Sequence, residues 1–223
     1  MLARATIATV LLAAPAPLPD LVQLRPTSVG VTRPPYRLVF ASSFANVGRA
    51  PLVIVATRRS RAASTLRADQ IVGARRIRAV GIVRYVVARS HRHFHLLGFD
   101  RYELLRGGRI VVRDRKTGFC LGDRTPFTRD APPPRFGGGQ CRRGQPGLLR
   151  VAEGLSPGWA DPYPPLAEGQ FLPLAGLPAG RYTLRHTVNP EHRVLESSYA
   201  NNSASVQFDL TWKDGVPALR IVG

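Results

Sequence analysis

Residues 206–212 read Val-Gln-Phe-Asp-Leu-Thr-Trp, and every second residue in this stretch is large and apolar. Alternate side chains of a β-strand point to opposite faces of a sheet, so the pattern predicts a strand with one buried face. Residues 181–188 are expected to form another strand, which begins after the turn residues Pro178-Ala179-Gly180. The C-terminal part of the chain therefore favours a β-sheet.

Short apolar stretches separated by turn residues continue upstream. Residues 36–44 and 52–56 are apolar and β-branched, with Asn46-Val47-Gly48 between them, which predicts strand, turn and strand. Residues 82–87 are a further strand candidate. Residues 58–80 are basic with weak periodicity, and we expect mostly loop there with at most a short helix.

The middle of the chain is expected to contain one hairpin and one long loop. Residues 91–105 should be largely extended, and Gly107-Gly108 predicts a two-residue turn into a strand at 109–113. This arrangement would pair the 91–105 strand with the segment that leads to Lys116. Residues 124–147 contain three consecutive prolines and three consecutive glycines, which predict a long loop.

Length and composition fit one domain built from many turns. The chain has 223 residues, including 21 glycines and 20 prolines, and it shows no internal repeat and no boundary that divides it. We therefore predict an all-β fold, an antiparallel β-sandwich-like domain with long loops and little helix.

The first residues have the pattern of an export signal. Arg4 precedes a largely apolar run of ten residues, 5–14, which is too short to span a membrane, and Ala14-Pro15-Ala16 has the small-x-small form of a cleavage site. Residues 1–17 are thus a predicted signal peptide, although an uncleaved anchor is an alternative, and 18–223 form the mature domain. Export implies an oxidising compartment, where Cys120 and Cys141 are expected to form a disulfide rather than remain two buried thiols.

The formal net charge is +18, from 32 basic and 14 acidic residues. This excess predicts attraction to polyanions, such as an anionic wall polymer or a lipid surface. No nucleic-acid-binding motif is present, so we expect no specific nucleic-acid partner.

Residues 91–95 read His-Arg-His-Phe-His and hold three of the five histidines. On a helix these three imidazoles would not share a face, whereas on a strand His91, His93 and His95 point the same way. Three neutral imidazoles can hold copper, zinc, nickel or iron and leave a position open. A solvated strand face that happens to carry histidines is the alternative interpretation.

Six motifs, in order along the chain, resemble the lysyl oxidase family in a compact bacterial form. The resemblance covers roughly residues 18–212 and includes the copper-binding histidines. The six stretches are Leu18-Pro19-Asp20-Leu21, His91-Arg92-His93-Phe94-His95, Arg101-Tyr102-Glu103-Leu104-Leu105, Lys116-Thr117-Gly118-Phe119-Cys120-Leu121, Gly154-Leu155-Ser156-Pro157-Gly158 with Asp161-Pro162-Tyr163, and Val188-Asn189-Pro190 with Glu196-Ser197-Ser198-Tyr199-Ala200-Asn201-Asn202.

The resemblance implies a secreted, copper- and quinone-dependent amine oxidase. Its cofactors would be copper and lysine tyrosylquinone, the latter derived from Lys116 and Tyr163 of the chain itself. Such an enzyme oxidises a primary amine, as a small molecule or as peptidyl lysine, to an aldehyde. Molecular oxygen is consumed, and hydrogen peroxide and ammonia are released.

The individual residues suit these roles. Lys116 is one of only two lysines, and Arg113 and Arg115 beside it would lower its pKa and so favour the nucleophilic amine. Tyr163 is expected on a loop, where it could approach a metal ion. A solvated turn lysine is the alternative for Lys116, although the rarity of lysine in this chain favours a function. Without the motif, a half-buried loop anchor would be the better explanation of Tyr163.

A carboxylate is the usual general base for such a reaction, and two are close to the motifs. Asp100 is the first candidate and Asp161 the second, while a surface or turn aspartate is the alternative for both. Because a basic surface repels basic substrates, we expect a small or differently charged amine, or an acceptor held in an anionic wall.

Two other functions also match parts of the sequence. One is a non-catalytic exported metal-binding or adhesion β-sandwich module. A resemblance to bacterial adhesion-related sandwich domains would explain 36–57 and 181–212, but not His91-Arg92-His93-Phe94-His95, Lys116 or Tyr163. A zinc hydrolase ranks last, because no glutamate stands beside the histidines as in His-Glu-x-x-His enzymes.

Overall fold

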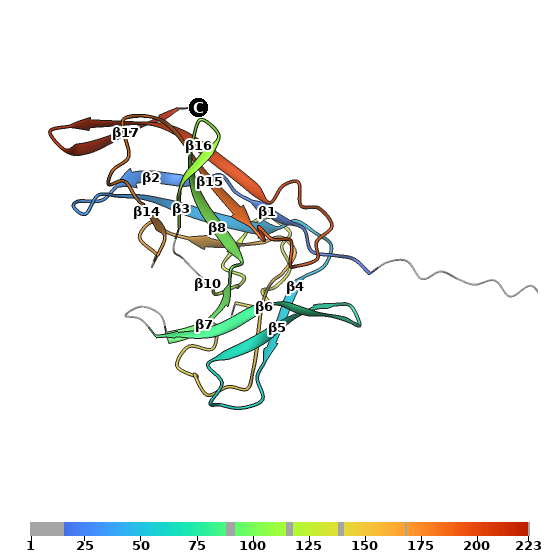
Figure 1. Cartoon of the computed structure of the whole chain (residues 1–223). Coiled ribbons are helices and arrows are strands. Elements are labelled where there is room, and N and C mark those ends of the chain that lie inside the picture. The colour runs from blue at the N-terminus through green and yellow to red at the C-terminus, as the bar shows by residue number, and fades with distance from the viewer. Residues whose placement is uncertain (1–15, 88–91, 115–117, 138–140, 168, 223) are drawn as a thin grey trace, which may run out of the picture.

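The computed structural model describes residues 16–87, 92–114, 118–137, 141–167 and 169–222 (Figure 1). These residues form strands and loops and contain no helix, so none of them belongs to a helix able to cross a membrane. The paired strands in these ranges run antiparallel and form three sheets. The prediction of an all-β antiparallel fold with little helix is confirmed.

The first sheet contains the stretch that predicted the fold and has the order β17-β16-β15-β8-β9. Tyr182 pairs with Phe208 across β15 and β16, and their rings stack with centroids 5.9 Å apart, so the alternating apolar face is buried as expected. The strands are β8 (Asp100–Arg106), β9 (Arg109–Arg113), β15 (Gly180–Val188), β16 (Ser203–Lys213) and β17 (Val216–Val222).

The second sheet is built around β3, which pairs with β1, β2, β13 and β14. It lies against the first sheet in the upper part of Figure 1, where Phe40 of β3 meets Tyr102 of β8 edge to face at 5.0 Å. Its strands are β1 (Leu21–Gln23), β2 (Thr27–Val31), β3 (Arg37–Asn46), β11 (Thr125–Pro126), β13 (Trp159–Tyr163) and β14 (Phe171–Pro173).

The third sheet forms the lower part of Figure 1 and has the order β10-β7-β6-β5-β4-β12. Its inner face contributes Ile54, Leu66, Val83 and Phe94 to the same apolar core that the other two sheets share. Its strands are β4 (Leu52–Thr57), β5 (Thr65–Val72), β6 (Arg75–Val87), β7 (Arg92–Leu97), β10 (Gly118–Phe119) and β12 (Arg150–Leu155).

Two sequence predictions about this sheet are wrong. Residues 58–80 are not mostly loop, because β5 and the start of β6 lie within them. Their outward positions carry arginines such as Arg67 and Arg76, which pair with Asp69, and this outer charge masks the strand pattern. The prediction failed because a strand with one solvated face needs few apolar residues.

The stretch 91–105 is not one strand paired with the segment before Lys116. The chain turns at Gly98, where φ is +67°, and divides into β7 and β8. Only β8 pairs with β9, through the expected turn at Gly107 and Gly108, while β7 lies between β6 and β10. His93 and His95 therefore belong to a different sheet from the 109–113 strand.

Cys120 and Cys141 form the predicted disulfide and tie the long loop to the third sheet. The backbone N–H of Phe94 donates to Cys141 O at 3.0 Å, so the loop lies along the edge of β7.

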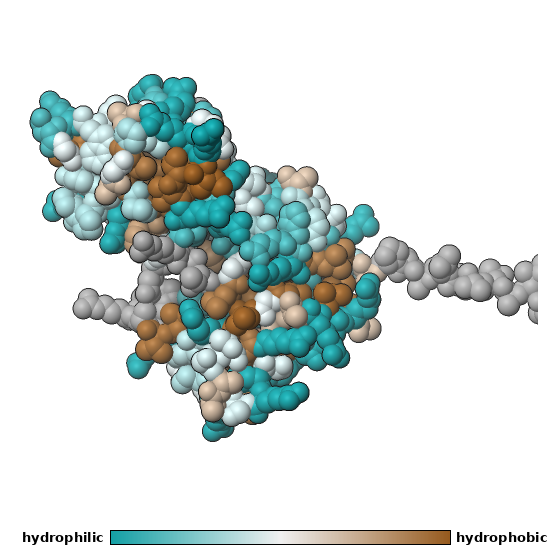
Figure 2. All heavy atoms as spheres, viewed as in Figure 1, coloured by the Kyte–Doolittle hydropathy of each residue, from teal (hydrophilic) through white to brown (hydrophobic). Residues whose placement is uncertain are grey.

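Hydrophilic residues cover much of the face of the molecule in Figure 2, interrupted by separate hydrophobic patches.

Candidate active site

His93 and His95 lie side by side on β7, as the two-residue period of the sequence predicts. Their Nε2 atoms are 2.8 Å apart, their ring centroids are 4.7 Å apart, and both residues are 7% exposed. Their side chains point away from the core, because the intervening Phe94 is fully buried on the inner face. The strand therefore presents two imidazole nitrogens at one place.

Two nitrogens bound to one metal ion at roughly 2.0–2.1 Å lie roughly 2.8–3.4 Å apart when the ligand angle is about 90–110°. The separation in the structure is close to this range, so small ring rotations would let both imidazoles hold one ion. Within the described ranges, no group of three or more His, Cys, Asp or Glu side chains is arranged for a metal ion. His91, the predicted third ligand, lies outside the described residues.

The short strand β10 connects the histidine pair with the predicted cofactor tyrosine. A Cβ on Gly118 would lie 2.8 Å from His95 Cβ, so only glycine lets β10 approach β7 this closely. The next residue, Phe119, points to the opposite face, where its ring meets that of Tyr163 edge to face at 5.1 Å. Lys116 precedes Gly118 by two residues in the sequence and lies outside the described residues.

Tyr163 is not on a loop, as the sequence suggested, but is the last residue of β13. The prolines around it misled the prediction, because β13 accommodates Pro162 by pairing it with Ser43 of β3. The phenol ring is held between Phe119 and Phe44, the latter stacked at 6.4 Å. Burial, followed by the charge of Asp161, raises the pKa of the Tyr163 hydroxyl well above its ordinary value.

The single proton of the Tyr163 hydroxyl has two acceptors within reach, Asp161 Oδ2 and the carbonyl oxygen of Cys120, each 3.0 Å from the hydroxyl oxygen. Asp161 is 1% exposed, and its carboxylate also accepts from the backbone N–H of Gly122 and from Arg124 Nε. Burial raises the pKa of Asp161 to about 7, although Arg124 and the hydrogen bonds oppose this. A carboxyl with such a pKa can exchange protons near neutral pH.

Asp100, the first candidate for the general base, lies at the start of β8 and contacts a different partner. Its Oδ1 is hydrogen-bonded to His186 Nε2, and His186 Nδ1 is hydrogen-bonded to Ser42 Oγ. The Tyr102 ring lies 4.2 Å from the His186 ring, centroid to centroid. The structure thus places Asp161, not Asp100, in contact with Tyr163.

Sequence reasoning missed His186 and Ser42, although a signal for His186 exists. In β15 the inward positions are Tyr182, Leu184, His186 and Val188, all at most 1% exposed. A histidine in a core position of an apolar alternation needs buried hydrogen-bond partners. Ser42 gave no comparable signal, because serine is common in strands of every kind.

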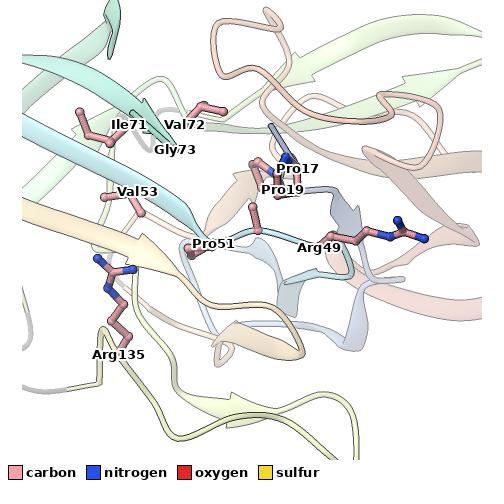
Figure 3. A pocket seen from close by; sticks show the side chains of 10 residues that line it. Pro17, Pro19, Arg49, Pro51, Val53, Ile71, Val72, Gly73 and Arg135 are labelled. Atoms are coloured by element: carbon pink, nitrogen blue, oxygen red, sulfur yellow. The ribbon is translucent and has the colours of Figure 1, made fainter. Parts of the chain in front are cut away.

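A cavity of about 330 Å³ lies apart from these residues, near the entry of the chain into the fold. Figure 3 shows Pro17 and Pro19 beside the loop that carries Arg49 and Pro51. Prolines, aliphatic residues and two arginines line this cavity, without histidine, tyrosine, lysine or carboxylate. It therefore lacks the groups that metal binding or proton transfer requires.

The family model for lysyl oxidase matches residues 81–216, which is more than half of the chain. The chain belongs to the lysyl oxidase family. The matched region includes β7, β10 and β13, and hence the histidine pair and the Tyr163–Asp161 pair. The resemblance inferred from the six motifs is confirmed at the level of the family.

Among curated proteins, this lysyl oxidase family member is similar to lysyl oxidase homolog 1 of Homo sapiens, with 33% identity over 120 residues, 50% of this chain and 18% of that protein. It is also similar to protein-lysine 6-oxidase of Rattus norvegicus, with 32% identity over 118 residues, 50% of this chain and 25% of that protein. The corresponding enzyme of Sus scrofa matches at 32% identity over 41% of its length. The matched stretch thus spans less than half of each relative.

Proposed function

We propose that this protein is a copper-dependent amine oxidase that converts primary amines to aldehydes, consumes oxygen and releases hydrogen peroxide and ammonia. The observation that carries the proposal is that β10 contacts both the histidine pair, through Gly118, and Tyr163, through Phe119. Membership of the lysyl oxidase family supports the reaction class. Relatives named protein-lysine 6-oxidase support an amine on a lysine-like chain as substrate.

His91, His93 and His95 would hold the copper ion, which supplies redox chemistry with oxygen when bound. Lys116 and Tyr163 would provide the amine and the phenol of the lysine tyrosylquinone cofactor. Phe44 and Phe119 fix the plane of the Tyr163 ring, so that a modified ring would stay in one orientation. Tyr163 remains partly exposed, so a substrate amine could reach the ring.

Asp161 is the general base that the geometry favours. Its Oδ2 is within hydrogen-bond distance of the Tyr163 hydroxyl, whereas Asp100 is hydrogen-bonded to His186. Arg124 stabilises the carboxylate form of Asp161 while burial opposes it, and a pKa of about 7 results. Asp161 could therefore accept a proton from a substrate carbon at neutral pH and release it again.

Peptide mapping of protein expressed with copper and oxygen tests the proposal. We expect a covalent pair of peptides that contain residues 116 and 163, together with redox-cycling staining for a quinone. Both signals should disappear in Lys116→Arg and in Tyr163→Phe. Lys213→Arg is the matched control, because Lys213 is the other lysine of the chain and ends β16. Unlinked peptides in copper-loaded protein would leave a metal-binding module without catalysis.

We also propose that the protein acts outside the cytoplasm. The Cys120–Cys141 disulfide supports this, because such bonds persist in oxidising compartments. The net charge of +18 supports association with an anionic wall polymer or lipid surface. Release from cells by high salt would test that association, and retention at high salt would exclude a purely electrostatic one.

A further inference from the structure

Arg84 lies directly opposite His95 in the ladder between β6 and β7, and Val86 lies opposite His93. Residues paired in this way point to the same face of a sheet, with Cβ atoms roughly 4.5–5.5 Å apart. The outer face of the third sheet therefore carries the Arg84 side chain next to the position of His95. Sequence reasoning missed this neighbour, because Arg84 and His95 lie on different strands, β6 and β7, whose register only the structure shows.

The charge of Arg84 is not neutralised by any carboxylate among the described residues. Arg84 is exposed and takes part in none of the ion pairs there, whereas Arg67 and Arg76 of the same sheet both pair with Asp69. The strands β6 and β7 contain no Asp or Glu at all. Within the ranges that the structure describes, Arg84 therefore has no carboxylate partner on this face.

The neighbours of Arg84 limit what the site could bind. Ile82, which is 47% exposed, and Val86 flank Arg84 on the same face of β6. Neither can hydrogen-bond to a ligand, but Thr65 of β5 lies directly opposite Arg84 and adds a hydroxyl on the same face. A guanidinium binds anions through several donors in a fixed plane. This combination suits a compact anion better than a large polar molecule.

We propose that Arg84 and a metal ion held by His93 and His95 together form a binding site for a small inorganic monoanion. The metal part of this site rests on the proposed function, in which the histidines hold copper. The reduced oxygen anions that form when oxygen takes up electrons belong to this chemical class. Arg84 would hold such an anion next to the metal and so set how long it stays there.

Azide titration of the copper-loaded full chain tests the site, because azide bound to Cu(II) produces a new absorption band. Arg84→Gln should weaken azide binding by roughly 10-fold or more, since a charge-assisted hydrogen-bond donor is lost. Arg92→Gln is the matched control: it removes the same charge next to His93, but Arg92 points to the opposite face of β7. It should bind azide as the unmodified protein does.

The copper content of each variant is measured in parallel, and affinities are compared per bound copper. Equal azide affinity with and without Arg84, or equal weakening in Arg92→Gln, would overturn the anion site and leave the amine oxidase proposal intact. Bound copper and weakened azide binding, without a cross-link between residues 116 and 163, would support the anion site and contradict the oxidase. Failure of the unmodified protein to bind copper would overturn both.

Discussion

The Tyr163 hydroxyl and the Asp161 carboxylate are hydrogen-bonded at 3.0 Å, and both residues lie on the same strand, β13. Residues two apart on a strand point to one face, which is why the pair can meet. Strand β13 is held in place by its pairing with β3, in which Asp161 lies opposite Phe44 and Tyr163 lies opposite Ser42. The candidate base and the candidate cofactor residue are therefore positioned by one short element.

Asp161→Asn is expected to lower amine oxidation by about 10²- to 10⁴-fold, the range typical for loss of a general base. The amide keeps the shape of the side chain but cannot accept a proton. In the unmodified protein, activity should rise with pH through about 7 as Asp161 loses its proton. Steady-state kinetics from pH 5 to 9 measure both effects. An unchanged rising limb in Asp161→Asn would assign the base elsewhere.

The same carboxyl should also make stability depend on pH. Its pKa is about 7 in the folded chain against an ordinary value of 3.8, so between these values the folded state holds a proton that the unfolded state has lost. The contribution of the Asp161 carboxyl to the free energy of unfolding is thus fully present below about pH 4 and is lost as the pH rises towards 7. Thermal unfolding curves should show that stability falls less between about pH 4 and pH 7 in Asp161→Asn than in the unmodified protein. Equal slopes would contradict the assignment.

His93→Ala and His95→Ala are each expected to reduce bound copper strongly, because each removes one imidazole from the adjacent pair. Elemental analysis after dialysis gives the copper content, and electron paramagnetic resonance reports the remaining nitrogen ligands. His192→Ala is the control, since His192 is exposed and stacks on Tyr199. Full copper loading in His93→Ala would mean that the pair is not a metal site.

The strands that position the site could largely be predicted from the sequence. Alternation at 181–188 and 206–212 marks strands that bury one face, and glycine pairs mark tight turns. Prediction failed where the outer face carries arginine, as in β5 and β6, because solvated charge hides a strand from any hydrophobic pattern.

The contacts within the site were harder to predict from the sequence than the strands that carry it. The histidine pair follows from a period of two, but the approach of Gly118 to His95 depends on β10 joining the edge of β7. No local rule predicts an edge strand of two residues. Asp100 and Asp161 both lie close to the sequence motifs, and only the tertiary contacts distinguish a partner of His186 from a partner of Tyr163.

Asp100→Asn is expected to lower stability rather than to abolish the reaction. Asp100 and His186 are both buried, so the change weakens a buried hydrogen bond and should cost about 1–3 kcal/mol in the free energy of unfolding. Urea denaturation gives this value, and kinetics per folded molecule should show a much smaller loss than in Asp161→Asn. A loss of activity as large as that of Asp161→Asn, without destabilisation, would instead make Asp100 the base.

Glu196 should be a main stabilising contact between the C-terminal loop and β1. Its carboxylate is 4% exposed and accepts hydrogen bonds from the Leu21 backbone N–H at 2.7 Å, from Asn189 Nδ2 at 2.5 Å and from Asn202 Nδ2 at 2.9 Å. Glu196→Gln replaces one carboxylate oxygen, a hydrogen-bond acceptor, with an amide NH2 group. That group must then face the N–H donor that the oxygen had accepted from. We expect a loss of about 1–3 kcal/mol in the free energy of unfolding.

Glu191→Gln provides the comparison for this variant, because Glu191 pairs with arginines only at the surface. Surface ion pairs contribute less than about 1 kcal/mol, so Glu191→Gln should leave the urea midpoint nearly unchanged. If both variants shift the midpoint equally, loss of a negative charge from a basic protein explains the effect. If only Glu196→Gln shifts it, the three buried hydrogen bonds are the cause.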